Sequence, residues 1–289
     1  NIGDVEYRVT KSSDKLAGFN LIGNPYTHNI YKGDGAAIPN GDLLSAGFYT
    51  MTKEGVWQSK TDADEIKVCQ GILVKALKSG TITMENKEGK ASKASNDQIM
   101  FSVFNSKFED HAYAVFDKGH GLDKISHFND KAPMVYIRQN NDDYAIAMFE
   151  KRKTFNLCFK AMTTGRYTLS VKPEGNISYL HIIDRLTGED IDMLKEHEYS
   201  FVASITDNDS RFIVRMSEID DAEESFVYQN GNDIIVTGNG ELQIFDMVGR
   251  LVNTQYVNGI GIVRKPSHSG VYIFRLVGET TRAQKIFVE

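Results

Sequence analysis

Apolar residues recur at every second position in many segments of this chain, and this period limits the possible fold more than any other feature. In the segment 155–161, FNLCFKA, the residues Phe155, Leu157 and Phe159 fall on one face, and the segments 166–172, 199–205 and 211–216 alternate in the same way. A period of two is that of a β-strand, and one apolar face per strand is typical of antiparallel sheets with one covered side. The sequence therefore predicts antiparallel strands.

Turn-forming residues separate these short segments at intervals of about eight to twelve residues, which favours a sandwich or barrel. The one helical candidate, DADEIKV at 62–68, is short and ends in β-branched residues. We therefore predict an all-β chain with a large antiparallel β-sandwich of jelly-roll-like type, followed by a small immunoglobulin-like β-sandwich. The large part is either one sandwich or two that divide near 90–98.

An acidic stretch, SEIDDAEES at 217–225, contains five carboxylates and almost nothing to bury. Like-charged polar stretches between strand-rich regions are typical of linkers. We expect a β-sandwich domain at 1–217, an acidic linker at 218–225 and a second domain at 226–289. The alternative is an acidic surface loop within a single domain.

The last sixty residues contain a predicted hairpin at DMVGR. Asp246 suits the first position of a type I turn, because its carboxylate can accept hydrogen bonds from the following amides. Gly249 stands where a positive φ is needed to enter the next strand, and Arg250 begins that strand. In the later segment 269–276, Tyr272 and Phe274 share one face. We expect five to seven short strands here.

Three spaced motifs in this region resemble the C-terminal sorting domain of the type IX secretion system, which occurs on exported proteins of Bacteroidetes-type bacteria. They are D-x-x-G-R, G-V-Y-x-x-R and a terminal K-I-x-V. The residues that carry the resemblance are Asp246, Gly249, Arg250, Gly270, Val271, Tyr272, Arg275, Lys285, Ile286 and Val288. A generic immunoglobulin-like terminal domain with a common hairpin turn is the alternative.

The resemblance implies a destination for the chain. It implies export across the inner membrane, transit through the periplasm and recognition of residues 226–289 by the outer-membrane secretion machinery. The protein would then be secreted or attached to the outer-membrane surface. The start of the chain, NIGDVEYRVTKSS, has neither a basic region nor an apolar core, so we expect a trimmed or mature chain rather than one that begins with a signal peptide. The segments 18–26 and 178–216 are similar to regions of the same class of exported proteins.

No motif for catalysis or nucleotide binding is found in the sequence, so we predict a non-enzymatic, adhesin-like or structural protein without a cofactor. The formal net charge is −6, with no long basic run, which argues against a nucleic-acid partner. A surface glycan or protein is the expected ligand of the large domain. Two alternatives stay open: the C-terminal, non-catalytic portion of an exported hydrolase, and a carbohydrate-binding module.

A few residues of the large domain are candidates for binding. Trp57 and Tyr49, with Phe48 and Tyr26 nearby, could stack on a sugar, although core packing is the simpler interpretation. The segment 111–127 could assemble a metal or acid–base site, although solvated turns are the simpler interpretation; its candidates are His111, His120, His127, Asp117 and Asp123. DADE at 62–65 and DNDS at 207–210 could offer oxygen ligands to Ca²⁺, but plain polar turns explain them equally, and we commit to no metal site. Cys69 and Cys158 could form one disulfide.

Overall fold

The protein was analysed as a computed structural model that describes residues 3–12, 18–90, 97–150, 154–175, 177, 179–216, 226–230, 232–278 and 281–288. These residues form strands and no helix, which confirms the all-β prediction. Consistent with this, none of them belongs to a helix that could span a membrane. The chain divides into two compact units, residues 1–217 and 218–289. The predicted acidic linker, and most of the predicted division near 90–98, lie outside the described residues.

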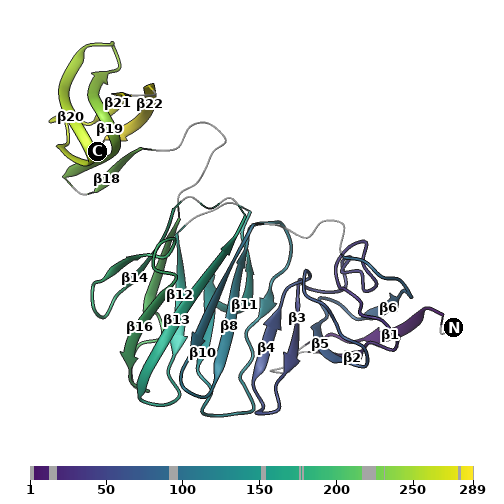
Figure 1. Ribbon diagram of the computed structural model, residues 1–289. Coiled ribbons are helices and arrows are strands. Elements are labelled where there is room, and N and C mark those ends of the chain that lie inside the picture. The colour runs from purple at the N-terminus through teal and green to yellow at the C-terminus, as the bar shows by residue number, and fades with distance from the viewer. Residues whose placement is uncertain are drawn as a thin grey trace. The chain divides into compact units, whose positions relative to one another are not determined.

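The first six strands form two small sheets at the N-terminal end of the first unit (Figure 1). β1 pairs with β6, and four strands pair in the order β2-β5-β3-β4. Their side chains enclose a core of their own that includes Ile30, Phe48 and Val74. The strands are β1 (Val5–Val9), β2 (Phe19–Gly23), β3 (Phe48–Met51), β4 (Trp57–Lys60), β5 (Gly71–Lys75) and β6 (Gly80–Met84).

The next eleven strands form one sheet in the order β15-β14-β17-β12-β10-β11-β8-β7-β13-β16, with β9 beside β11. Neighbouring strands are antiparallel, as predicted, except that β8 and β11 are parallel. The strands are β7 (Gln98–Phe104), β8 (Glu109–Val115), β9 (Leu122–Asp123), β10 (Met134–Gln139), β11 (Asp142–Met148), β12 (Phe155–Lys160), β13 (Gly165–Glu174), β14 (Leu180–Asp184), β15 (Asp190–Asp192), β16 (Glu198–Ala203) and β17 (Phe212–Met216).

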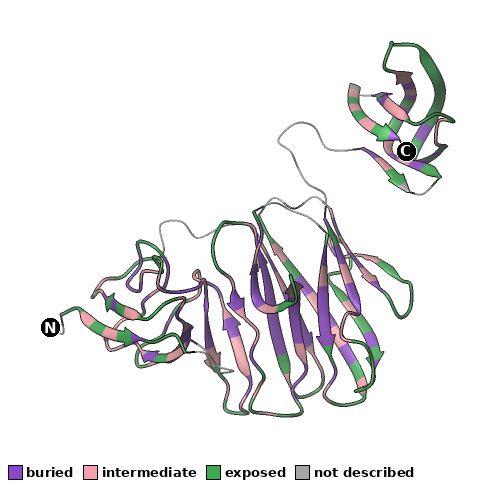
Figure 2. Ribbon diagram, turned by 180° about the vertical axis from the view of Figure 1, so that it is seen from behind, coloured by how far each residue is buried: buried purple, intermediate pink, exposed green. Residues whose placement is uncertain are grey.

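This large sheet curls until its two ends face each other across a single core. Phe201 on β16, which ends the sheet, lies 5.2 Å from Phe212 on β17, near the opposite end, measured between ring centroids. The alternation seen in the sequence explains the arrangement, because every second residue of these strands is buried and the residues between are largely exposed (Figure 2). Both layers of the sandwich therefore come from one hydrogen-bonded sheet.

A third apolar cluster joins the two cores of the first unit. Tyr49 from β3 is fully buried against Ile146 from β11, with Leu122 and Ala145 in the same cluster. Gly47, just before β3, has a φ of +67° and lies so close to the Ile146 side chain that a Cβ would overlap it. The large domain thus has two cores that are joined through this cluster.

The helical candidate at 62–68 forms no helix, in agreement with the all-β prediction. The backbone N–H and the hydroxyl of Thr61 donate to the carboxylate of Asp64, which closes a turn. Ile66 then forms an isolated antiparallel bridge with Ile30. Local hydrogen bonds of Asp and Thr side chains compete with helix formation, and here they prevail.

The second unit contains five strands in one sheet, in which β18, β19, β21 and β22 are adjacent and β20 lies on the free side of β19. The two ends of the sheet approach each other, because the Gln284 side chain accepts hydrogen bonds from the backbone N–H groups of Phe226 and Val227. The two layers thus come from one bent sheet rather than from two separately bonded ones. The strands are β18 (Val227–Asn230), β19 (Asp233–Asp246), β20 (Leu251–Arg264), β21 (Gly270–Val277) and β22 (Thr281–Val288).

Candidate functional sites

The hairpin between β19 and β20 has the predicted turn. Gly249 donates its N–H to the carbonyl of Asp246 at 3.0 Å and has a φ of +80°. The Asp246 carboxylate accepts from the N–H groups of Val248 at 3.1 Å and Arg250 at 2.9 Å, and from Nε of Arg250 at 3.0 Å. These backbone hydrogen bonds from Arg250 and Val248 hold the pKa of Asp246 below its usual range. The D-x-x-G-R motif therefore encodes a bulged hairpin of defined shape.

The three motifs, which are far apart in sequence, meet at one end of the terminal sheet. Asp246 at the end of β19 pairs with Tyr272 on β21, and Tyr272 pairs with Ile286 on β22. Gly270 pairs with Val288 in the neighbouring row. Tyr272 is 8% exposed and its hydroxyl donates to the carbonyl of His268 at 2.9 Å, whereas Val288 is fully buried. These residues build the end of the sheet.

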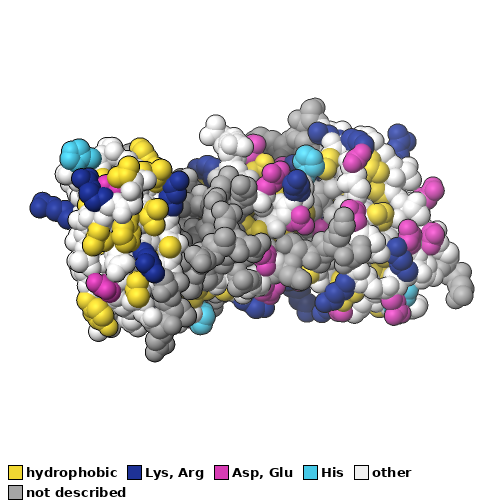
Figure 3. Space-filling view, turned by 90° about the horizontal axis from the view of Figure 1, so that it is seen from above, with side chains coloured by type: hydrophobic (Ala, Val, Ile, Leu, Met, Phe, Trp, Pro, Cys, Tyr) yellow, Lys and Arg dark blue, Asp and Glu magenta, His cyan; other side chains and the backbone are white. Residues whose placement is uncertain are grey.

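The remaining motif residues face the other way. Arg250, Arg275 and Lys285 are exposed, and Val271 is half-buried on the same outer face as Arg275. Apolar neighbours surround them: Ile273 is 37% exposed and Phe287 is 61% exposed. In Figure 3 the terminal unit, at the left, shows apolar side chains interspersed with Lys and Arg. We call Arg250, Val271, Ile273, Arg275, Lys285 and Phe287 the outer-face patch.

β20 is the exposed edge of this unit. It pairs with β19 along its 14 residues, except at Val252, and among the described strands with no other. Residues 251–256 are exposed on both faces of the strand, and Tyr256 has 74% of its surface in solvent. An edge of this kind presents unpaired backbone N–H and C=O groups.

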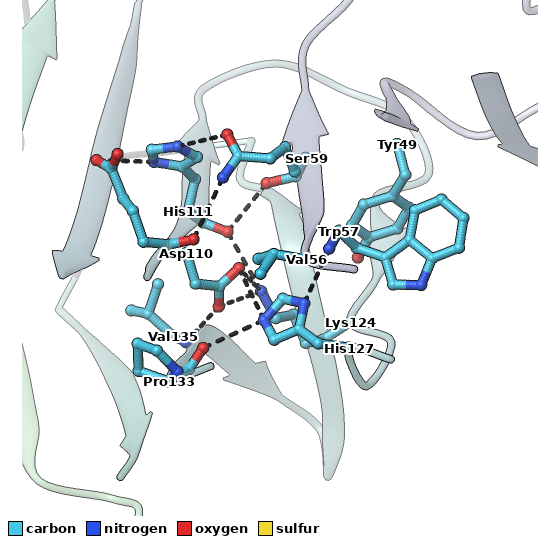
Figure 4. Close-up of polar contacts among 12 residues, drawn as sticks. Tyr49, Val56, Trp57, Ser59, Asp110, His111, Lys124, His127, Pro133 and Val135 are labelled. Atoms are coloured by element: carbon cyan, nitrogen blue, oxygen red, sulfur yellow. Dashed lines mark hydrogen bonds and ion pairs between the residues drawn. The ribbon is translucent and has the colours of Figure 1, made fainter. Parts of the chain in front are cut away.

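A fully buried ion pair of the first unit lies where β4 meets β8 (Figure 4). The Lys124 ammonium contacts both carboxylate oxygens of Asp110, at 2.6 and 2.5 Å, and the two side chains are 1% and 0% exposed. The backbone N–H of Val135 donates to the same carboxylate at 2.7 Å. Burial alone would raise the pKa of Asp110, but the Lys124 charge and the His127 contact outweigh burial and hold it low. Burial lowers the pKa of Lys124, although the negative charge of Asp110 acts to raise it.

Hydrogen bonds fix the orientation of two histidines beside this pair. Nδ1 of His127 accepts from the backbone N–H of Trp57 at 3.1 Å, so the proton is on Nε2, which donates to the carbonyl of Pro133. Nε2 of His111 donates to Gln58 at 3.0 Å and its Nδ1 accepts from the Ser102 hydroxyl at 2.8 Å. Burial lowers the pKa of His111, against the attraction of nearby carboxylates. The cluster thus ties the small sheets to the large one.

This arrangement corrects the predicted site at 111–127. His111 and His127 are buried, so they are neither solvated turn residues nor neighbours of His120, which is exposed. Asp123 forms an ion pair with Lys75, and Asp117 is exposed on the loop before His120. The described residues contain no group of three His, Cys, Asp or Glu side chains placed to hold a metal.

The candidate Ca²⁺ loops use their carboxylates in other ways. Asp209 accepts from the Tyr136 hydroxyl at 2.6 Å and contacts Arg138 at 3.0 Å. Asp62 contacts the buried ammonium of Lys32 at 3.0 Å. Internal cations and hydroxyls therefore satisfy these carboxylates.

A pocket of about 450 Å³ opens beside Asp62 in the first unit. Leu44, Val115 and Ile146 form its apolar part, and polar residues of two glycine-rich loops, 33–41 and 117–120, also line it. No local pattern in the sequence indicates this cavity, because residues about eighty positions apart form its two walls.

The predicted aromatic platform is only partly correct. Tyr49 is 0% exposed and its hydroxyl donates to the carbonyl of Asp123 at 2.6 Å, so Tyr49 is wrong as a ligand contact. Phe48 and Tyr26 are buried as well. Trp57 is half-buried, and its ring lies 5.7 Å from that of Phe128, which is 73% exposed.

Both cysteines are free thiols, with Cys69 exposed and Cys158 buried. Burial raises the pKa of the Cys158 thiol, which opposes formation of the reactive thiolate.

Comparison of the chain with protein-family models, with curated proteins and with solved structures gives no match.

Proposed function

We propose that this chain is an exported cell-surface or secreted protein of adhesin-like or structural type, in which residues 226–289 act as the signal read by an outer-membrane secretion machinery. The observation that carries the proposal is the meeting of three separated motifs at one end of a separately folded terminal unit. Part of each motif builds that end, and another part faces solvent.

A division of this kind suits a recognition signal. Asp246, Gly249 and Tyr272 fix the backbone, so that Arg250, Arg275 and Lys285 are held at defined positions on a rigid sheet. Rigid presentation lowers the entropy cost of binding, and apolar contacts next to cations are common at protein interfaces. Packing within the unit explains the presence of Asp246, Gly249 and Tyr272. It does not require Arg250, Arg275 and Lys285, which are exposed.

Charge reversal on the outer-face patch tests this proposal. In the producing organism, the combined substitution of Arg250→Glu, Arg275→Glu and Lys285→Glu should lower the amount of exported protein by about tenfold or more, since like charges now face the receptor. Matched reversals at exposed Lys107 and Arg166 of the first unit should leave export unchanged.

Each variant needs an unaltered melting curve by circular dichroism, because these residues are exposed and should not affect folding. Export of the triple variant at the level of the parent chain would contradict the proposal.

A carbohydrate-binding role for the first unit is a second candidate, favoured by the Trp57 and Phe128 rings. Trp57 begins β4, and Phe128 lies on the loop before β10; Met51, which pairs with Trp57 across β3 and β4, is 50% exposed. Aromatic faces are suited to stacking on sugar rings. Binding to a glycan array that is lost in Phe128→Ala and kept in Leu186→Ala, an exposed apolar residue elsewhere, would support this role; equal binding by both variants would exclude it.

A further inference from the structure

The open edge of β20 points to the way in which the terminal unit meets its partner, an inference that rests on the function proposed above. We infer that β20 pairs with an extended strand of a partner protein, and that this strand is uncharged in its middle and flanked by acidic residues at both ends.

The edge is available for pairing. β19 is hydrogen-bonded on both sides, and β21 lies between β19 and β22. At the other margin, the Gln284 side chain of β22 already bonds the backbone of β18 at Phe226 and Val227. Among the described strands of this unit, β20 is the one with an open edge: neither another strand nor a bonded side chain such as that of Gln284 lies along it.

The edge also lacks the usual protection against pairing. Natural edge strands carry inward charges or prolines, or are very short. β20 is 14 residues long, and residues 251–263 include no Asp, Glu, Lys, Arg or Pro. A register shift opposite Phe245 leaves Val252 without a partner on β19, and from Asn253 to Arg264 the pairing runs on without a break, past a positive φ at Gly259. The solvent-facing residues of β20, with Val252 and Tyr256 among them, suit an apolar or β-branched partner.

Charge at the two ends specifies the partner further. Arg250 stands immediately before the strand, and Arg264 and Lys265 stand at its end. Between these two ends, the charged side chain of Glu241 on β19 contacts β20: it accepts a hydrogen bond from the Thr254 hydroxyl at 3.1 Å. Acidic residues at both ends of the incoming strand would therefore be attracted, and charges in its middle would not be matched.

The same charges disfavour a second copy of this chain as the partner. Antiparallel pairing of β20 with β20 of another copy, centred on the strand, would place Arg250 of one copy opposite Lys265 of the other. Like charges directly opposite each other destabilise paired strands. The basic ends thus act against self-association of an otherwise unprotected edge.

A synthetic peptide tests the inference directly. The probe is a fluorescent peptide of about thirteen alternating valine and threonine residues with two aspartates at each end, so that the aspartates lie opposite Arg250 and opposite Arg264 and Lys265; it is titrated with the full chain at low salt. We expect binding by fluorescence anisotropy, and binding about tenfold weaker when lysines replace the aspartates. Amide hydrogen exchange should show new protection at every second residue of β20.

Two matched variants keep the test independent of folding. Tyr256→Glu adds a negative charge beside the edge and should weaken binding of the aspartate peptide by about tenfold, whereas Ile273→Glu on the interior strand β21 should change it by less than about twofold. Equal binding of the two peptides, protection outside β20, or a dimer in sedimentation equilibrium that Tyr256→Glu dissociates would each overturn the inference.

Export assays of the same variants separate this inference from the proposed function. Normal export of Tyr256→Glu, together with failed export after removal of residues 226–289, would overturn the role of the edge and leave the proposed signal intact. Normal export after that removal would overturn the proposed function itself.

Discussion

Replacement of Asp110 by Asn should destabilise the first unit by about 3–5 kcal/mol, because it leaves the Lys124 ammonium buried without a counterion. At 2.6 Å and an effective dielectric constant of about 20, the attraction within the pair is about 6 kcal/mol, which the loss of hydration largely offsets. Lys124 can escape by losing its proton, and this costs about 4.6 kcal/mol at pH 7 for a side chain with an ordinary pKa of about 10.4. That cost sets the upper bound of the effect.

The double variant Asp110→Asn with Lys124→Met should recover most of this loss, to within about 1–2 kcal/mol of the parent chain. Asn keeps an acceptor for the backbone N–H of Val135, and Met fills the space of the lysine stem without a charge. The control is Asp42→Asn, which breaks an exposed ion pair with Lys78 and should cost less than about 1 kcal/mol.

Urea unfolding of the full chain, followed by tryptophan fluorescence, measures all three variants. Trp57 is the single tryptophan and its backbone N–H donates to His127 beside the cluster, so the signal reports this region. A loss below about 1 kcal/mol in Asp110→Asn, or a double variant as unstable as the single one, would refute the reasoning.

Three other substitutions have defined expected outcomes. Burial lowers the pKa of His111 in the folded chain, so the contribution of His111 to the free energy of unfolding should be constant above a pH of about 6.5 and fall below it by up to about 1.4 kcal/mol per pH unit. His111→Gln should flatten this slope in the same fluorescence assay. An unchanged slope would contradict the assignment. Gly249→Ala, at a φ of +80°, should cost about 1 kcal/mol in thermal unfolding followed by circular dichroism, whereas Gly270→Ala should cost less than about 0.5 kcal/mol, and equal costs would contradict the turn geometry. Gly47→Ala should cost more than about 2 kcal/mol in urea unfolding, because its Cβ would overlap Ile146, and a neutral effect would mean that the two cores are not closely joined.

The sequence is sufficient for the strands and the hairpin because these features depend on neighbouring residues. The alternation at 155–161 and 166–172 predicts which residues are buried, and DMVGR predicts the turn through the short reach of the Asp246 side chain. The same locality explains why the helical candidate at 62–68 forms a turn, because the Asp64 carboxylate accepts hydrogen bonds from Thr61.

The buried polar cluster could not be predicted in this way. Asp110 precedes three histidines and two further aspartates in the segment 111–127, and nothing in that order indicates that Lys124, rather than a metal, neutralises it. Tyr49 likewise belongs to an aromatic segment whose exposure depends on β11, about a hundred residues away. The contact of the half-buried Trp57 ring on β4 with Phe128 joins residues about seventy positions apart, which no local pattern encodes.

The most direct test of the account is the location of the first unit after removal of residues 226–289 in the organism that produces the protein. Cell fractions should be compared by immunodetection, with the Leu186→Ala full-length variant as the control for detection and folding. The account predicts that the shortened chain accumulates in the periplasm while the control reaches the surface or the medium. Surface display or secretion of the shortened chain at the level of the control would contradict it.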